Sequence, residues 1–155
     1  MNGTVKIGMQ APDFEALTTM GVINSNDYRG KWVVLFSHPG DFTPVCTTEI
    51  IAMANANTYF ENLGAKLIGL SVDSNSSHLA WLYDIYLKTG VVVPFPIIAD
   101  RNGTIARKYG MISNDISNTQ TVRNVYIINP EGIVKSILIY PMEVGRFIPE
   151  ILRLL

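Results

Sequence analysis

The order of apolar and polar positions predicts strands that alternate with helices along most of the chain. Residues 32–36 are all apolar, as in a strand buried on both faces of a sheet. Shorter apolar runs predict further strands at 66–72, 97–99, 124–129 and 133–140. Apolar residues at spacings of three and four predict helices at 47–64, 74–88, 102–109 and from about 145 to the end.

Turn and capping residues agree with these boundaries. Gly64 suits the end of the first helix, and Ser74 suits the cap of the second. Residues 130–132, Pro-Glu-Gly, join the last two strands as a hairpin. Residues 1–12 read as an irregular arm, residues 10–16 as a short edge segment, and residues 111–121 as a polar irregular stretch.

The predicted order of elements is β-α-β-α-β-α-β-β-α. Strands separated by helices pair in parallel, whereas the late hairpin adds an antiparallel portion. The pattern therefore predicts an α/β protein with a central mixed sheet flanked by helices, and a thioredoxin-like fold matches it best. The 155 residues contain no repeat or linker, so we expect residues 1–155 to form a single domain.

Composition favours a large core or buried subunit interfaces. Hydrophobic residues make up 48% of the chain and charged residues only 16%, below the ~25% of an average globular protein. No apolar run approaches the ~20 residues of a membrane helix, and a net charge of −1 provides no basic excess for nucleic acid. We therefore expect a homodimer or larger oligomer that binds neither membrane nor nucleic acid. Three of the last four residues are leucines, so we expect an end that is either docked or cut from a longer chain.

The chain has a single cysteine, Cys46, so it forms no internal disulfide and no Cys-x-x-Cys pair. His38 and His78 are far apart in the sequence, and with one cysteine they make a poor zinc site, so we expect no metal and no cofactor. Residues 1–10 lack the basic start and apolar block of a signal peptide. A reducing cytoplasm is the expected compartment.

Cys46 lies in a segment, residues 37–49, where a strand, a rigid loop and a helix start meet. Two prolines and a glycine precede Cys46 and exclude regular structure just before it. A helix start favours a thiolate, because its free N–H groups and dipole attract negative charge. An isolated buried cysteine is more often an inert packing residue, but this local sequence favours a reactive one.

Residues 38–49 read His-Pro-Gly-Asp-Phe-Thr-Pro-Val-Cys-Thr-Thr-Glu and resemble the active-site segment of the peroxiredoxins. The form Asp-Phe-Thr-Pro-Val-Cys-Thr-Thr-Glu is similar to that of the one-cysteine, peroxiredoxin-6-like subgroup and its archaeal relatives. The resemblance extends over nearly the whole chain. It includes residues 11–14, 69–74, 96–100 and 125–128, His78 with Trp81, Tyr140 with Pro141, and Gly145 with Arg146.

The resemblance implies a thiol-dependent peroxidase that reduces hydrogen peroxide and organic hydroperoxides. It implies that Cys46 is the peroxidatic cysteine, which a hydroperoxide oxidises to a sulfenic acid. Thr43 would orient the peroxide, Pro44 would shield the pocket from water, and Arg123 would stabilise the thiolate and the developing oxyanion. Preorganised donors of this kind contribute several kcal/mol.

The resemblance also implies supporting roles. Glu49 and Arg146 would form an ion pair that holds Arg123, although Glu49 also reads as a first-turn helix carboxylate and Arg146 as a surface cation. His38 either bonds near the pocket or packs in the loop beside a proline. His78 reads as an exposed helix position. The aromatic residues Phe42, Trp32 and Trp81 read as core or interface residues.

The chain departs from the family pattern in two respects. It has no resolving cysteine, so an external thiol must reduce the sulfenic acid: a thioredoxin-like protein, a glutaredoxin-like protein or a small thiol. It also stops before the C-terminal dimerisation domain of the subgroup, so we expect either a shortened chain or an abbreviated member. No Gly-x-Ser-x-Gly element for a phospholipase is present.

Two other functions fit a reactive cysteine. Cys46 would be the switch in a redox sensor or a chaperone-like binding protein whose assembly changes on oxidation. Alternatively, Cys46 and His38 would act in a cysteine hydrolase. The hydrolase is disfavoured because both residues share one loop, where Asp41 is the one evident carboxylate to orient the histidine.

Overall fold

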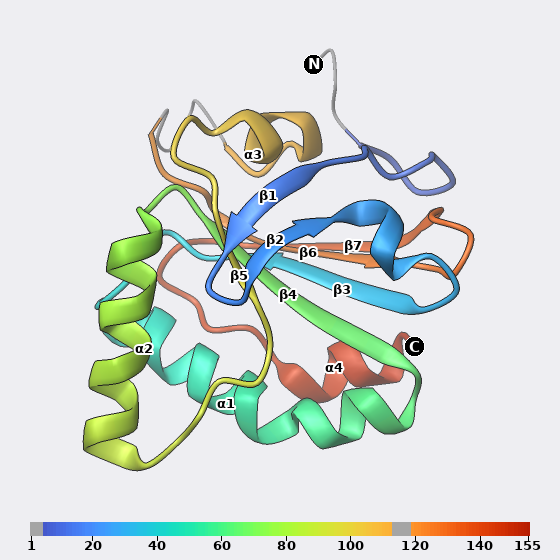
Figure 1. The fold of residues 1–155 in the computed structure, drawn as a ribbon. Helices are drawn as coiled ribbons and strands as arrows, with labels where there is room; N and C mark the ends of the chain where they lie inside the picture. The colour runs from blue at the N-terminus through green and yellow to red at the C-terminus, as the bar shows by residue number, and fades with distance from the viewer. Residues whose placement is uncertain (1–4, 113–118) are drawn as a thin grey trace.

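A seven-stranded mixed sheet forms the centre of the computed structural model, which describes residues 5–112 and 119–155 (Figure 1). The strand order is β2-β1-β5-β4-β3-β6-β7. In chain order the strands are β1 (Glu15–Thr18), β2 (Gly21–Asn24), β3 (Trp32–Ser37), β4 (Ala65–Ser71), β5 (Ile97–Ala99), β6 (Arg123–Ile128) and β7 (Val134–Tyr140). The prediction of a mixed sheet flanked by helices is confirmed.

The central strand β3 is buried on both faces, as the apolar run at 32–36 predicts. It pairs in parallel with β4 and antiparallel with β6. Val34 and Phe36 face one hydrophobic cluster, whereas Val33 and Leu35 face another. These neighbours place the end of β3, from which the Cys46 loop starts, beside the beginning of β6.

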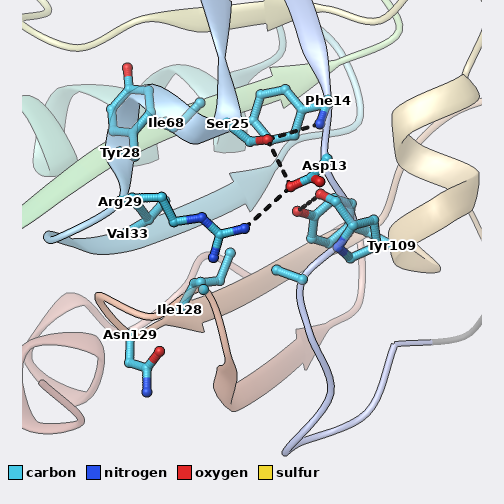
Figure 2. A pocket seen from close by; sticks show the side chains of 13 residues that line it. Asp13, Phe14, Ser25, Tyr28, Arg29, Val33, Ile68, Tyr109, Ile128 and Asn129 are labelled. Atoms are coloured by element: carbon cyan, nitrogen blue, oxygen red, sulfur yellow. Dashed lines mark hydrogen bonds and ion pairs between the residues drawn. The ribbon is translucent and has the colours of Figure 1, made fainter.

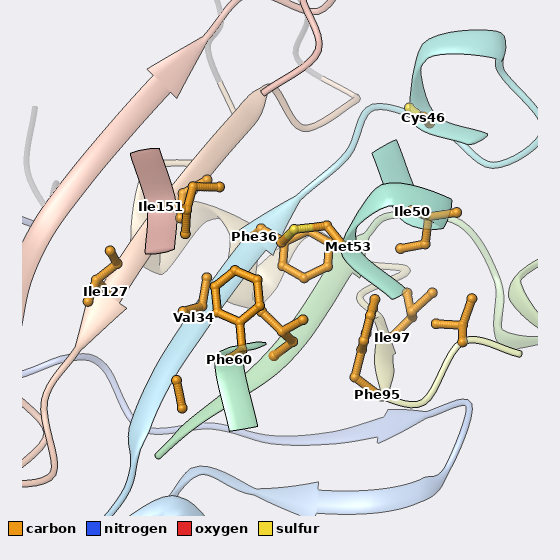
Figure 3. Close-up of a cluster of buried hydrophobic side chains, with 14 of the residues drawn as sticks. Val34, Phe36, Cys46, Ile50, Met53, Phe60, Phe95, Ile97, Ile127 and Ile151 are labelled. Atoms are coloured by element: carbon orange, nitrogen blue, oxygen red, sulfur yellow. The ribbon is translucent and has the colours of Figure 1, made fainter. Parts of the chain in front are cut away.

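Three helices cover the face of the sheet that carries Val34 and Phe36 (Figure 1). They are α1 (Pro44–Asn62), α2 (Asn75–Thr89) and α4 (Ile148–Arg153). Figure 3 shows Phe60 and Ile127 among the side chains that fill this cluster. Leu154 and Leu155 pack against the same cluster and are half-buried, so the apolar end of the chain is docked.

The opposite face is covered by α3 (Thr104–Tyr109) and by the segment that contains the β1–β2 hairpin. Phe14 and Ile23 from this segment pack with Tyr109 and Tyr126. A pocket on this side is lined by Tyr109, Arg29 and Asp13; Figure 2 shows the Arg29–Asp13 ion pair and the Ser25 hydroxyl that donates to Asp13.

The structure differs from the sequence prediction at three places. The β1–β2 hairpin and the 3₁₀ turn at Ser25–Tyr28 were not predicted, because each strand has only four residues and little burial to give an alternating pattern. Helix α1 begins at Pro44 rather than at residue 47, since a proline in the first turn loses no hydrogen bond. Helix α4 begins at Ile148 rather than near 145.

The remaining elements agree with the prediction to within about two residues, which is the usual uncertainty of helix ends. The hairpin turn contains Gly132 at φ +83, where a Cβ would lie 1.5 Å from Nη1 of Arg29. Of the predicted irregular stretches, residues 1–4 and 113–118 lie outside the described residues. Among the helices in the described ranges, none combines the length and the apolar character needed to cross a membrane.

The packing of α1 on the sheet gives a stability prediction. Phe60 is fully buried, so Phe60→Ala should lower the free energy of unfolding by about 3–5 kcal/mol. The neighbouring Tyr59 is exposed, and Tyr59→Ala should change it by less than about 0.5 kcal/mol. Urea denaturation of both variants measures the difference; equal losses would contradict this placement of the helix.

Candidate active site

Cys46 lies in the first turn of α1 and is only 1% exposed. Thr43 occupies the N-cap position with an extended backbone, and Pro44 follows as the first helical residue. The main-chain oxygen of Thr43 accepts a hydrogen bond of 2.9 Å from the N–H of Thr47, which starts the helix. Figure 3 shows Cys46 at the start of α1, beyond Ile50 and Met53 of the same helix.

A shallow pocket of about 260 Å³ opens beside this helix start. Its lining includes Thr43, Pro44 and Arg123, and also Val45, which directly precedes Cys46. The Thr43 hydroxyl donates to the carbonyl oxygen of Gly40 at 3.0 Å and keeps its lone pairs for a further donor. The pocket therefore brings Arg123 from β6 beside Thr43 and Pro44 at the start of α1.

Arg123 is the first residue of β6 and is almost completely buried. The pairing of β6 with β3 carries it to the end of β3, next to the loop that leads to Cys46. Its Nη1 donates to Oε1 of Glu49 at 2.6 Å, and its Nε donates to the carbonyl oxygen of Met142 at 2.6 Å. These two hydrogen bonds fix the plane of the Arg123 guanidinium through Nε and Nη1, and neither of them occupies the third nitrogen, Nη2.

Glu49 is a buried carboxylate held by two arginines. Arg146 donates from Nε to Oε2 at 2.9 Å and from Nη2 to Oε1 at 2.8 Å, and its main-chain N–H also donates to Oε2. Burial alone would raise the pKa of Glu49, but the hydrogen bonds and charge of Arg146, with the charge of Arg123, hold that pKa below its usual value.

The alternative readings of two residues are therefore wrong. Arg146 is not a surface cation, because it is 8% exposed and its Nη1 also donates to the carbonyl oxygen of Asn124 at 2.9 Å. Glu49 is not a first-turn carboxylate, because α1 starts at Pro44 and has no acidic residue in its first turn. The sequence did not show that both charges would be buried together.

His38 and His78 meet at the carboxylate of Asp41. His38 Nε2 lies 2.7 Å from Oδ1 and His78 Nδ1 lies 2.7 Å from Oδ2, with all three side chains almost fully buried. Burial lowers the pKa of His38 despite the Asp41 charge. Although burial opposes it, the hydrogen bonds from both histidines lower the pKa of Asp41 far below its usual value.

His78 is thus not at an exposed helix position, as the sequence predicted. It is 0% exposed, and its Nε2 lies 3.0 Å from the carbonyl oxygen of Ile98. The burial of His78 depends on Asp41 in a loop and on Ile98 in β5. The apolar pattern along α2 gives no information about these partners. The packing-only reading of His38 is also wrong, since Asp41 binds it. In the sequence, Asp41 is evident only as a possible partner of His38.

The aromatic residues divide into two groups. Trp81 is buried, with its Nε1 donating to the Thr47 hydroxyl at 3.0 Å, and Trp32 packs against the same cluster. Phe42 is 54% exposed, so it is not a core residue. Its φ of +64 is the one positive value at a non-glycine residue in the described ranges, a conformation that costs roughly 1–2 kcal/mol.

The described residues include one group with the donors for a cation. Ligand atoms of His38, Asp41, Asp73 and His78 lie within 4.8 Å of one another, so the histidines that are distant in sequence are neighbours in space. However, the two histidine–Asp41 contacts of 2.7 Å are shorter than the ~3.3 Å between ligands of a tetrahedral ion with 2.0 Å bonds. Shared protons fit these contacts better than a metal ion.

The fold and this site define a class: a thioredoxin-like protein with one cysteine at a helix start beside a buried arginine. The AhpC/TSA family model matches residues 7–137. The chain therefore belongs to the AhpC/TSA family, the peroxiredoxins, and its enzyme class is thiol-dependent peroxidase, as the sequence resemblance implies.

Relatives agree with this membership. The chain is 58% identical over 150 residues to "Peroxiredoxin 2" of Caldanaerobacter subterraneus, covering 97% of this chain and 68% of that protein. It is 51% identical to a peroxiredoxin of Aquifex aeolicus, with shares of 96% and 68%.

Solved structures are similar as well. A yeast mitochondrial 1-Cys peroxiredoxin superposes with a TM-score of 0.89 at 44% identity, with 97% of this chain and 74% of that chain covered. A cysteine-to-serine mutant of the peroxiredoxin 6 of Arenicola marina gives a TM-score of 0.88 at 40% identity, with 96% and 71% covered.

The buried ion pairs of Glu49 give a pH-dependent prediction. Glu49→Gln should lower the free energy of unfolding at pH 7 by about 3 kcal/mol, because two guanidiniums lose their counter-charge. Because the pKa of Glu49 is lower in the folded protein than its unfolded value near 4.5, the charged carboxylate stabilises the fold above pH 4.5. This stabilisation is lost as the pH falls through the folded pKa. The difference between wild type and Glu49→Gln should therefore shrink below pH 4.5.

Urea titrations of both proteins between pH 3 and 7 measure this difference. Glu150→Gln is the matched control, because Glu150 pairs with Arg153 on the surface, where an ion pair contributes little. A Glu49→Gln difference that stays constant with pH would contradict the assignment.

Proposed function

We propose that Cys46 is the peroxidatic cysteine and that it reduces hydrogen peroxide and organic hydroperoxides. Its thiolate attacks the terminal oxygen of the hydroperoxide, a sulfur–oxygen bond forms and the oxygen–oxygen bond breaks. Sulfur is oxidised to a sulfenic acid, and the departing oxygen takes up a proton and leaves as water or an alcohol. The observation that carries the proposal is the buried, doubly anchored Arg123 beside the helix start that bears Cys46.

The proposed roles of the neighbours follow from their positions. Arg123 supplies a fixed positive charge to the thiolate and to the oxygen that departs, at no cost for reorganisation during the reaction. The Thr43 hydroxyl oxygen accepts a hydrogen bond from the peroxide. Pro44 lines the pocket with apolar surface that limits the access of water. Glu49 and Arg146 act as positioning residues for Arg123, and His38 supports the loop.

An external thiol completes the proposed cycle, since the sequence contains no second cysteine. A thioredoxin-like protein, a glutaredoxin-like protein and a small thiol are the candidate classes. The yeast mitochondrial 1-Cys peroxiredoxin has a thiol resolving mechanism that uses the glutathione and thioredoxin systems, which supports the same classes of reductant here. A reducing compartment such as the cytoplasm is part of the proposal, because it maintains such thiols.

We further propose that the domain, residues 1–155, forms homodimers through the edge strand β7. It is the last strand of the sheet, so one row of its backbone groups has no strand partner among the described residues. Its side chains are largely half-buried, whereas Ile139 is 71% exposed. An open apolar edge of this kind favours pairing with a second copy.

The peroxidase proposal predicts the effects of two substitutions. Cys46→Ser should abolish fast peroxide consumption in a competition assay, and Arg123→Lys should slow it about 10²- to 10³-fold, because the ammonium loses the planar contacts to Glu49 and Met142. Arg153→Lys, at an exposed pair, is the control that should keep the wild-type rate. Unchanged consumption by Cys46→Ser contradicts the proposal, and slow turnover with a change in oligomer mass on oxidation favours the redox sensor.

The dimer proposal predicts the behaviour of edge variants. Light scattering at micromolar concentration should give the mass of a dimer or larger oligomer for the wild type, and a smaller mass for Ile139→Lys, because a charge on an edge strand opposes pairing. Val22→Lys is the matched control, since Val22 is 65% exposed on the opposite edge strand β2. A monodisperse wild-type monomer would contradict the proposal.

A further inference from the structure

A turn that follows β7, residues 141–144, contributes to the pocket at the start of α1. Its first and last residues are joined by a hydrogen bond of 3.2 Å, which the N–H of Val144 donates to the carbonyl oxygen of Pro141. Both residues between them, Met142 and Glu143, belong to the lining of the pocket. The turn thus brings one apolar and one acidic side chain to the pocket.

Buried charged groups hold this turn on both sides of Glu143. The carbonyl oxygen of Met142 accepts a hydrogen bond of 2.6 Å from Nε of Arg123. Two residues after the turn, Arg146 binds the carboxylate of Glu49 through both its side chain and its main-chain N–H. The ion pairs that orient Arg123 therefore also fix the backbone around Glu143, and its place at the pocket is a property of the fold.

The charges around the pocket leave its mouth negative. Arg123 and Glu143 are the two charged residues of the pocket lining. Arg123 shares Glu49 with Arg146, so two positive charges meet one negative charge and one positive charge remains. The thiolate of the proposed mechanism balances that positive charge. Glu143 is exposed, and no cation of the described ranges forms an ion pair with it, so its negative charge is left over at the mouth.

The other lining residues suit the uncharged part of an organic hydroperoxide. Pro39, Pro44, Val45 and Met142 provide apolar side chains. With a volume of about 260 Å³, the pocket holds the peroxide group and a small organic group. A charge at the far end of that organic group therefore lies at the mouth, where Glu143 is exposed.

We propose that Glu143 is a specificity-determining residue, which makes the pocket select uncharged hydroperoxides over anionic ones. The proposal rests on the peroxidase function proposed above and defines its substrate class as hydrogen peroxide and hydroperoxides with uncharged, apolar substituents. A hydroperoxide that carries a carboxylate meets the like charge of Glu143. Two such charges roughly 7 Å apart in water slow the encounter about threefold, and more where the surroundings are less polar.

Three probes that differ in charge test the proposal: cumene hydroperoxide, its para-carboxylate and its para-trimethylammonium derivative. The reduced protein is mixed with each probe at low salt, and formation of the sulfenic acid at Cys46 is followed by quenched mass spectrometry. The rate constant of each charged probe is divided by that of cumene hydroperoxide. Comparing these two ratios between variants and wild type cancels the intrinsic reactivity of each probe and any general change in the reactivity of Cys46.

Glu143→Gln removes the charge and keeps the size of the side chain. The ratio for the carboxylate probe should rise about 3- to 10-fold at low salt, and the ratio for the trimethylammonium probe should fall by a similar factor. Both changes should shrink in about 1 M salt, where charges are screened over ~3 Å. Glu143→Lys should shift both ratios further in the same directions. Glu131→Gln is the matched control and should keep both wild-type ratios, because Glu131 is exposed in the hairpin turn that follows β6, whereas Arg123 starts that strand.

The outcomes separate the two proposals. If none of the three probes produces a sulfenic acid at Cys46, the peroxidase function itself fails. If the sulfenic acid forms but Glu143→Gln keeps both wild-type ratios, or shifts both in the same direction, the charge selection alone is overturned. Opposite shifts that are equally large in Glu131→Gln also overturn it, because they would arise from the net charge of the protein and not from the pocket.

Discussion

The buried carboxylate of Glu49 connects three parts of the chain that are far apart in sequence. It lies in α1, Arg123 starts β6, and Arg146 precedes α4. A carboxylate away from water is costly unless cations and donors surround it, and each arginine is costly for the same reason. The three side chains therefore require one another, and this requirement ties the helix of Cys46 to the sheet. The orientation of Arg123 at the pocket follows from that connection.

A second buried carboxylate, Asp41, organises the other end of the Cys46 loop by different chemistry. Glu49 is neutralised by guanidiniums, which stay charged at all physiological pH values. Asp41 is bound by the imidazoles of His38 and His78, which are buried with it. The loop that leads to Cys46 is therefore anchored to α2 by neutral ring nitrogens or charge-assisted hydrogen bonds, whereas Glu49 is anchored by two permanent cations.

The parts of the fold that were predictable have strong local periodicity. The apolar run of β3 and the helical spacing of apolar residues in α2 follow directly from which of their own residues are buried. The predicted positions of these two elements therefore agree with the structure. The β1–β2 hairpin was missed because its strands are short and exposed, and they pair only once the sheet exists; β1 joins β5 through the single pair Thr18 and Ile98. The start of α1 differs from the predicted residue 47 because a proline breaks the interior of a helix, whereas the first turn accepts it.

The sequence by itself determined the mixed α/β architecture, the strand–loop–helix segment around Cys46 and, through its motifs, the family. Only the tertiary structure decided which charged groups are buried together. Arg146 read equally well as a surface cation and His78 as an exposed helix residue, yet both are buried against carboxylates from other elements. The physical reason is that periodicity depends on neighbours along the chain, whereas the burial of a charge depends on a partner that the fold delivers from elsewhere.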